Sequence, residues 1–213
     1  MVRRKAKYQV DRDIEPVYAK AWTFINSGEY DRARRVFLGL LEVCPDDPCL
    51  LNSIGVTYFR EGGEVEKAER YFREALKRAP DFAVPYSNLS SLLSTLERFE
   101  ESAKYARRAI EYEPESAEPW MNLGLYYARL GDLKSGLEYF LAAYNFDLNY
   151  VEAAYNAACA FTALGRIEDA LEYLEKAIVK ERCYKMSLTD PALAPLRELP
   201  EFQEIMKRAG NRK

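Results

Sequence analysis

The chain has 213 residues, 48% of them hydrophobic and 31% charged, which is the composition of a folded protein rather than a disordered one. Its 31 Lys and Arg residues nearly balance 34 Asp and Glu residues, and the net charge of −3 argues against a dedicated nucleic-acid-binding protein. No apolar run approaches the roughly 18 residues that a membrane-spanning helix needs, and no hydrophobic signal segment follows Met1. We therefore expect a cytoplasmic protein without membrane insertion.

The first residues of the chain are basic. Arg3, Arg4, Lys5 and Lys7 lie in the opening "MVRRKAK", and we expect residues 1–13 to form a flexible, solvated segment. A membrane-binding or RNA-binding arm is the alternative. Four charges are few for such an arm, and no apolar anchor follows them.

The chain has four cysteines, Cys44, Cys49, Cys159 and Cys183. The first two lie in "CPDDPC", whose spacing differs from the CxxC of redox and zinc sites. We expect reduced thiols, as is usual in the cytoplasm, with a Cys44–Cys49 disulfide as the alternative in an oxidising compartment.

A helical phrase recurs along the chain. It begins at residues 28, 63, 97, 131 and 165, as in "GEVEKAERYFREALKRAP" and "GRIEDALEYLEKAIVKER", and a second helical pattern precedes each copy. The unit is therefore a helix, a short turn and another helix. Glycines mark most of the turns and prolines end several of the second helices; these residues are Gly28, Gly63, Gly131, Gly165, Pro45, Pro80 and Pro114. The second unit carries one extra residue near "EGGEVE", which predicts a longer turn there.

The stretch "PWMNLGLYYARLG" shows how one unit is built. Trp120, Leu123, Gly124 and Tyr127 lie at i, i+3, i+4 and i+7, so they share one face of a helix. A glycine inside a helix costs about 1 kcal/mol relative to alanine. Its place on the apolar face predicts that another backbone, in the second helix of the unit or in the next repeat, approaches closely there.

These positions resemble the tetratricopeptide repeat (TPR) family. The Leu–Gly pair at Leu123–Gly124 recurs as Ile54–Gly55. The small residue of the second helix is Ala33, Ala68, Ser102, Gly136 or Ala170, and the bulky position after it is Phe37, Phe72, Phe140 or Leu174. The resemblance implies an all-α, right-handed superhelical solenoid whose neighbouring repeats bury a continuous core. We expect five repeats, at about 14–47, 48–82, 83–116, 117–150 and 151–184.

The last part of the chain, residues 185–213, is expected to cap the array. Lys180 and Arg182 replace the apolar residue and proline that end earlier repeats, so the second helix of the fifth repeat is expected to run on. Asp190 before Pro191 is a good helix start. Pro200 begins another short helix with Phe202, Ile205 and Met206 on one side.

Nothing in the sequence indicates catalysis. The chain has no histidine, which excludes Ser-His-Asp and Cys-His arrangements and histidine-ligated zinc. It also has no GxxxxGK[ST] or GxGxxG phosphate-binding loop. We expect a non-catalytic protein with no cofactor and no metal.

The family resemblance implies that the first helices line a concave groove for a partner peptide or helix. Asn88, Asn122 and Asn156 recur every 34 residues there, and such amides can both donate to and accept from a peptide backbone. The alternative is that they bond within the groove or to water. The groove residues implied are Tyr18, Trp22, Asn52, Val56, Phe59, Arg60, Asn88, Met121, Asn122, Leu125, Arg129, Tyr155 and Asn156.

One family function is not expected. TPR domains that hold the C-terminal carboxylate of heat-shock chaperones use lysine, asparagine and arginine at groove positions that here carry Tyr18, Trp22, Ser53, Val84 and Asn88. The carboxylate clamp is incomplete, so we expect no chaperone-tail binding.

The function implied is a protein-interaction adaptor or scaffold. The alternative is a self-assembling structural module, because the first repeat has no evident cap before it and presents Val17 and Phe24, with Tyr8 and Val10 nearby.

Overall fold

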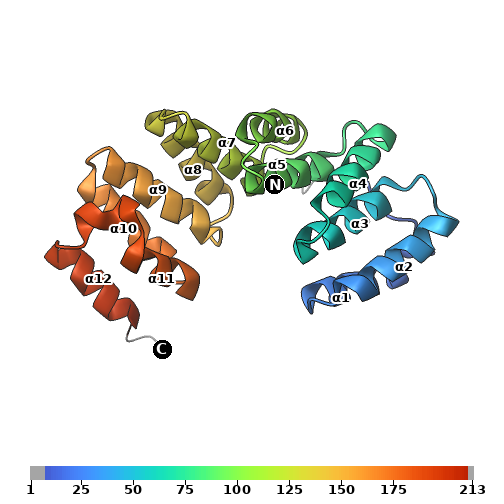
Figure 1. Ribbon diagram of the computed structural model, residues 1–213, viewed down its shortest axis with the longest axis horizontal. Coiled ribbons are helices and arrows are strands. Elements are labelled where there is room, and N and C mark those ends of the chain that lie inside the picture. Colours follow the sequence, from blue (N-terminus) through green and yellow to red (C-terminus); the bar gives the residue numbers. More distant parts are fainter. Residues whose placement is uncertain (1–7, 211–213) are drawn as a thin grey trace. The chain divides into compact units, whose positions relative to one another are not determined.

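The computed structural model describes residues 8–210, and every regular element within them is a helix (Figure 1). The helices are α1 (Glu15–Asn26), α2 (Tyr30–Val43), α3 (Pro48–Glu61), α4 (Val65–Arg78), α5 (Ala83–Thr95), α6 (Phe99–Tyr112), α7 (Ala117–Arg129), α8 (Leu133–Phe146), α9 (Val151–Ala163), α10 (Ile167–Ala177), α11 (Glu181–Thr189), the 3₁₀ helix η1 (Pro191–Leu196) and α12 (Pro200–Gly210).

The chain divides into two compact units. The N-terminal unit, up to Glu113, contains α1–α6, and the C-terminal unit, from Pro114, contains α7–α12. Helices follow one another as side-by-side pairs in each unit (Figure 1). We call α1, α3, α5, α7 and α9 the A helices and α2, α4, α6, α8 and α10 the B helices. The paired arrangement confirms the expected all-α helix-turn-helix fold.

Helix starts follow the local sequence. The Asp47 carboxylate accepts hydrogen bonds from the backbone N–H groups of Cys49, at 2.7 Å, and Leu50, at 3.1 Å, and Pro48 opens α3. Asp132 caps α8 in the same way by accepting from the N–H of Ser135 at 3.2 Å. An aspartate therefore caps one A helix and one B helix.

The turns between A and B helices need one residue in the left-handed region. Gly28, Gly131 and Gly165 adopt it as expected, with φ from 73° to 80°. In the second turn the left-handed residue is Gly62 (φ 82°), so the assignment to Gly63 is wrong. The expected longer turn is also wrong, because three residues separate the A and B helices in every pair; the added residue lengthens α3, which has 14 residues where α5, α7 and α9 have 13. The third turn uses Glu97 at φ 57°, a conformation that disfavours any residue with a Cβ atom.

The glycine of the apolar face is required by close packing. A Cβ atom at Gly124 would overlap the ring of Phe140 on α8, the B helix of the same pair. Gly55 has the same relation to Phe72 on α4, whose Cε1 atom would lie 2.6 Å from a Cβ. On α8, a Cβ at Gly136 would lie 3.2 Å from the backbone oxygen of Gly124. The expectation that Gly124 marks a close approach is confirmed.

Each unit has its own core. Phe37, Phe72 and Leu89 are fully buried in the N-terminal unit, and Leu174 and Leu193 in the C-terminal unit. Small B-helix residues, Ala33, Ala68, Ser102 and Ala170 among them, have no exposed surface, so the A and B helices pack at short distance.

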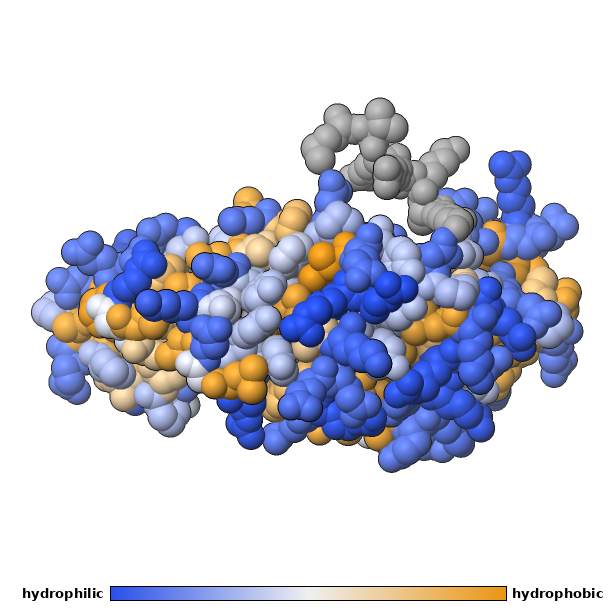
Figure 2. Space-filling model, turned by 90° about the horizontal axis from the view of Figure 1, so that it is seen from above, coloured by the Kyte–Doolittle hydropathy of each residue, from blue (hydrophilic) through white to orange (hydrophobic). Residues whose placement is uncertain are grey.

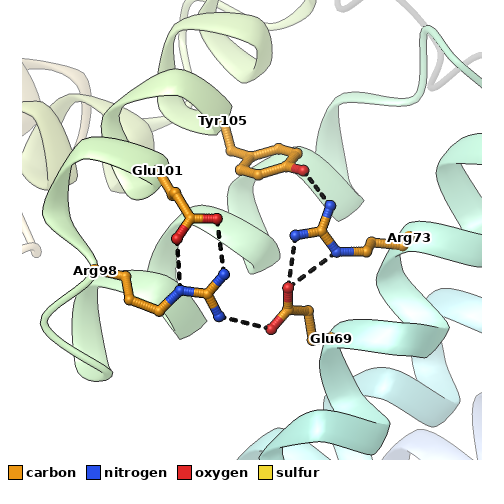
Figure 3. Close-up of polar contacts among 5 residues, drawn as sticks. All are labelled: Glu69, Arg73, Arg98, Glu101 and Tyr105. Carbon is orange, nitrogen blue, oxygen red and sulfur yellow. Dashed lines mark hydrogen bonds and ion pairs between the residues drawn. The ribbon is translucent and has the colours of Figure 1, made fainter.

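A charged network joins two B helices of the N-terminal unit (Figure 3). Glu69 of α4 accepts from Arg73 at 2.6 and 2.9 Å and from Arg98, just before α6, at 2.9 Å. Arg98 also donates to Glu101 at 2.7 Å, and Arg73 donates to the Tyr105 hydroxyl at 2.5 Å. The network therefore ties neighbouring helix pairs together on the side of the B helices.

The start of the chain differs from the expected flexible segment. Residues 1–7 lie outside the described residues. Tyr8 stacks on Phe82, with ring centroids 4.9 Å apart, and its hydroxyl donates to Asp81. Val10 is half-buried and packs beside it. The expectation of a flexible segment as far as residue 13 is therefore wrong for these two residues, and neither is an exposed part of the first repeat.

The end of the chain also differs in part. The last B helix, α10, stops at Ala177 and does not run on, because the backbone of Lys180 is extended and α11 begins anew at Glu181. Asp190 caps the next helix by accepting from the N–H of Ala192 at 2.9 Å, although that helix is 3₁₀ rather than α. The expected helix at Pro200 is present, with Phe202, Ile205 and Met206 buried.

Substituting Gly124 by alanine tests the close packing. We expect Gly124→Ala to lower the free energy of unfolding by about 1–2 kcal/mol, because overlap with Phe140 outweighs the better helix propensity of alanine. Gly39→Ala is the matched control, since nothing lies within 4 Å of its added Cβ, and it should raise stability by about 0.5–1 kcal/mol. Urea unfolding followed by circular dichroism measures both. A neutral or stabilising Gly124→Ala would contradict the packing argument.

Substituting Glu69 by glutamine tests the charged network. Burial by itself would raise the pKa of Glu69, but hydrogen bonds from Arg73 and Arg98 outweigh it and lower the pKa. A carboxylate whose folded pKa lies below its unfolded value of about 4.3 stabilises the fold above that pH and loses this contribution as the pH falls through the folded pKa.

We therefore expect Glu69→Gln to cost about 1–2 kcal/mol at pH 7, with the difference from wild type shrinking below about pH 4. Glu101→Gln is the control; its carboxylate is half exposed and should cost less than about 1 kcal/mol. Thermal unfolding from pH 7 to pH 3 measures both, and a pH-independent loss at Glu69 would speak against a charged contribution.

Candidate binding surface on the A helices

The A helices carry far fewer charges than the B helices. Helix α5 has no charged residue and α9 has only Glu152, whereas α4 has eight and α6 has six. Every residue of α3 from Cys49 to Tyr58 is buried, since this helix packs against both neighbouring pairs. Water solvates the B helices more strongly, and the A helices present the less polar side of each unit.

Figure 2 shows one face of the molecule, and its hydrophilic residues are interspersed with small hydrophobic patches. On this face exposed apolar side chains are therefore scattered, as is ordinary for a protein surface.

In the N-terminal unit, the predicted groove residues divide into two groups. Arg60 is exposed, and Tyr18, Trp22, Phe59 and Asn88 are half-buried. Asn52 and Val56 are buried, with 5% and 6% of their surface exposed, so they offer little area to a partner.

Two contacts link successive A helices of this unit. The Tyr18 hydroxyl lies 2.8 Å from Ser53 Oγ, and Asn88 Nδ2 donates to Asn52 Oδ1 at 2.8 Å. The Tyr18 ring also packs on Phe37, with centroids 5.4 Å apart, and burial raises the pKa of its hydroxyl. The alternative that the asparagines bond within the groove therefore holds in part for Asn88, because one of its two N–H groups bonds to Asn52.

In the C-terminal unit, Leu125 is half-buried and Arg129 is exposed on α7. Met121, Asn122 and Tyr155 are buried, each with 4–6% of its surface exposed. These three side chains therefore offer little area to a partner.

Two predicted groove residues of α9 bond within the unit. Asn156 Nδ2 donates to the Glu152 carbonyl at 3.0 Å and lies 3.7 Å from the sulfur of Met121. The Tyr155 hydroxyl donates to Asp190 Oδ2 at 2.7 Å, and burial, followed by this bond, raises its pKa. The segment that begins η1 therefore covers the part of α9 that carries Tyr155.

Sequence reasoning missed the partners of these side chains. Ser53 and Asp190 each lie 35 residues after the tyrosine they bond, so the repeat length itself was the available signal. It also missed the ion pair between Glu152 and Lys180, at 3.2 Å.

The cysteines carry no sign of reactivity. All four thiols are free, including Cys44 and Cys49. Burial raises the pKa of both Cys49 and Cys159 to about 12, so each stays protonated at neutral pH.

Pairs of antiparallel helices, repeated every 34–35 residues with a fixed pattern of small and bulky residues, define a helical repeat protein. A tetratricopeptide repeat model matches residues 18–82 and 88–150, and a second one matches residues 151–178. The chain belongs to the tetratricopeptide repeat family. Proteins of this family are generally interaction modules for other proteins and are typically non-catalytic.

Known proteins resemble this chain in part. The TPR repeat-containing protein PA4667 of Pseudomonas aeruginosa is 44% identical over 55 residues, which is 26% of this chain and 9% of that protein. The chain thus spans a small part of that relative.

Solved structures share the fold. TTC0263, a thermophilic TPR protein of Thermus thermophilus, superposes with a TM-score of 0.65 at 21% identity, covering 92% of this chain and 97% of that one. MamA from Desulfovibrio magneticus RS-1 gives a TM-score of 0.64 at 17% identity, covering 82% and 98%. At these identities the similarity concerns the fold alone.

Among residues 8–210, no helix combines the length and apolar character that crossing a bilayer requires.

Proposed function

We propose that the protein is an adaptor or scaffold whose A helices bind a segment of another protein. The observation that carries the proposal is the contrast between the two sets of helices: each A helix has at most two charged residues, against five or more on every B helix except α8, and the A helices present half-buried aromatic and amide side chains. Aromatic residues at a partly dry surface are the usual anchors of protein interfaces.

The side chains available for contact are fewer than the sequence implied. Trp22, Phe59 and Leu125 supply apolar area, and Arg60 supplies an exposed cation for a partner carboxylate. Asn88 can still bond a peptide backbone, because an amide has two N–H donors and two acceptor lone pairs and the bond to Asn52 uses one donor.

The chaperone-tail function is not part of the proposal. Tyr18 and Trp22 occupy clamp positions where the family uses polar or cationic groups, and their ring centroids lie 5.4 Å and 6.3 Å from that of Phe37. The prediction remains that an acidic chaperone-tail peptide does not bind.

The division into five repeats and a cap is part of the same proposal, with the cap beginning at Glu181, where α11 starts. We also place the protein in the cytoplasm, which its four free thiols support.

A pull-down from lysate of the source organism tests the adaptor function. We compare wild type with Arg60→Glu, which reverses an exposed cation of A helix α3, and with Lys104→Glu, which reverses an exposed cation of B helix α6. The partner should be lost, about tenfold or more, in the A-helix variant alone, because a reversed charge on a partly dry surface costs over about 1.4 kcal/mol.

Purified partner is then titrated against the same three proteins. Equal affinity for all three would reject the A-helix surface as the binding site.

A second candidate function is self-assembly through the first helix pair. Val17 is 45% exposed on α1 and Val43 is 72% exposed at the end of α2. Light scattering over a wide concentration range distinguishes the candidates: a strict monomer excludes assembly, and an oligomer that Val17→Asp/Val43→Asp disrupts would favour it.

A further inference from the structure

The first described residues of the chain lie across the junction of two later repeats. We call Tyr8–Val10 the strap. The strap site consists of Cys49 at the start of α3 and of Ala79, Asp81 and Phe82 between α4 and α5. With the strap in place, Cys49, Ala79 and Phe82 expose 7%, 1% and 9% of their surface.

The contact has the chemistry of peptide recognition. The Tyr8 ring packs on Phe82 at 4.9 Å between centroids while its hydroxyl donates to the Asp81 carboxylate. Val10 packs two residues further on, beside the same small cluster, and Gln9 between them is exposed. An extended chain presents alternate side chains to one surface, so the strap binds as a short extended peptide would.

The strap site is rigid and specific to one junction. The Tyr86 hydroxyl donates to the Pro80 carbonyl at 3.0 Å, which holds the loop between α4 and α5. One and two periods later the residues matching Asp81–Phe82 are Glu115–Ser116 and Asn149–Tyr150. The first pair lacks the aromatic ring and the second lacks the carboxylate, so this junction combines both groups.

The strap leads directly into the first repeat. Its contacts include the Tyr8–Phe82 ring pair, the Tyr8–Asp81 hydrogen bond and the packing of Val10, and it is followed by a turn at Asp11, whose carbonyl accepts from the N–H of Ile14 at 3.1 Å. A tethered segment sees its site at an effective concentration of order millimolar, so contacts of modest strength suffice to occupy the site in cis.

We propose that the strap site is a docking site for an extended segment of a partner protein that carries a tyrosine followed two residues later by an aliphatic residue. The strap occupies the site until that segment displaces it. The residues involved lie apart from the exposed A-helix residues, so this proposal does not depend on the proposed function. The carboxylate of Asp81 favours a segment with basic residues near its tyrosine, as in the chain's own sequence before Tyr8.

Alkylation of Cys49, followed by mass spectrometry, tests the proposal. The full-length proteins are wild type, Tyr8→Ala and the matched control Gln9→Ala. The probe is an unlabelled peptide with the sequence of residues 1–13, and its control replaces the tyrosine with alanine. Cys183, 1% exposed in the C-terminal unit, reports global unfolding in the same experiment.

We expect Tyr8→Ala to speed alkylation of Cys49 about tenfold, because the thiol becomes hydrated, while Gln9→Ala behaves as wild type and Cys183 is unchanged. The peptide at about 1 mM should restore protection in Tyr8→Ala, and the control peptide should not. Asp81→Asn, which changes the site instead of the strap, should also speed alkylation.

Three results would overturn the proposal. Cys49 could react equally slowly in wild type, Tyr8→Ala and Asp81→Asn, so that the strap does not cover it. Both peptides could protect equally or neither could, so that the site does not select tyrosine. Light scattering could show a wild-type dimer that Tyr8→Ala abolishes, in which case the strap's partner is a second copy of this chain.

Discussion

The close approach of A and B helices within each pair is the constraint on which the rest of the structure depends. At Gly55 and Gly124 no side chain fits, because the rings of Phe72 and Phe140 fill the space that a Cβ atom would need. This contact fixes the distance between paired helices, and the next pair then packs on the face that remains. The stack is a sum of similar junctions, as expected for a repeat protein.

Polar contacts between neighbouring helices recur at about the repeat length. Tyr18 bonds Ser53, Asn88 bonds Asn52, and Tyr155 bonds Asp190, at separations of 35, 36 and 35 residues. The last contact lies between α9 and the residue that begins η1, at the separation seen between neighbouring A helices. Leu193 and Leu196 of η1 are fully buried beside it.

The sequence predicted the helices, their pairing and the close approach at Gly124 because these depend on local period and residue size. It did not predict which groove residues stay accessible. Met121 and Tyr155 have the right spacing, yet neighbouring helices bury them, and burial depends on what lies one repeat away. The docking of Tyr8 on Phe82 was missed because Tyr8 precedes the first repeat and has no counterpart in the repeat pattern. The break after Ala177 was missed as well.

The Tyr8–Asp81 hydrogen bond spans 73 residues, about twice the separation of the contacts between neighbouring A helices. In a stack held by nearest neighbours alone, an end repeat can fray without disturbing the rest. The strap adds a connection between the segment leading into the first pair and the start of the third. Unfolding of the segment that leads into α1 must therefore also break the contact of Tyr8 with Asp81 and Phe82, just before α5. The strap thus makes unfolding of the N-terminal unit more cooperative than nearest-neighbour stacking alone would.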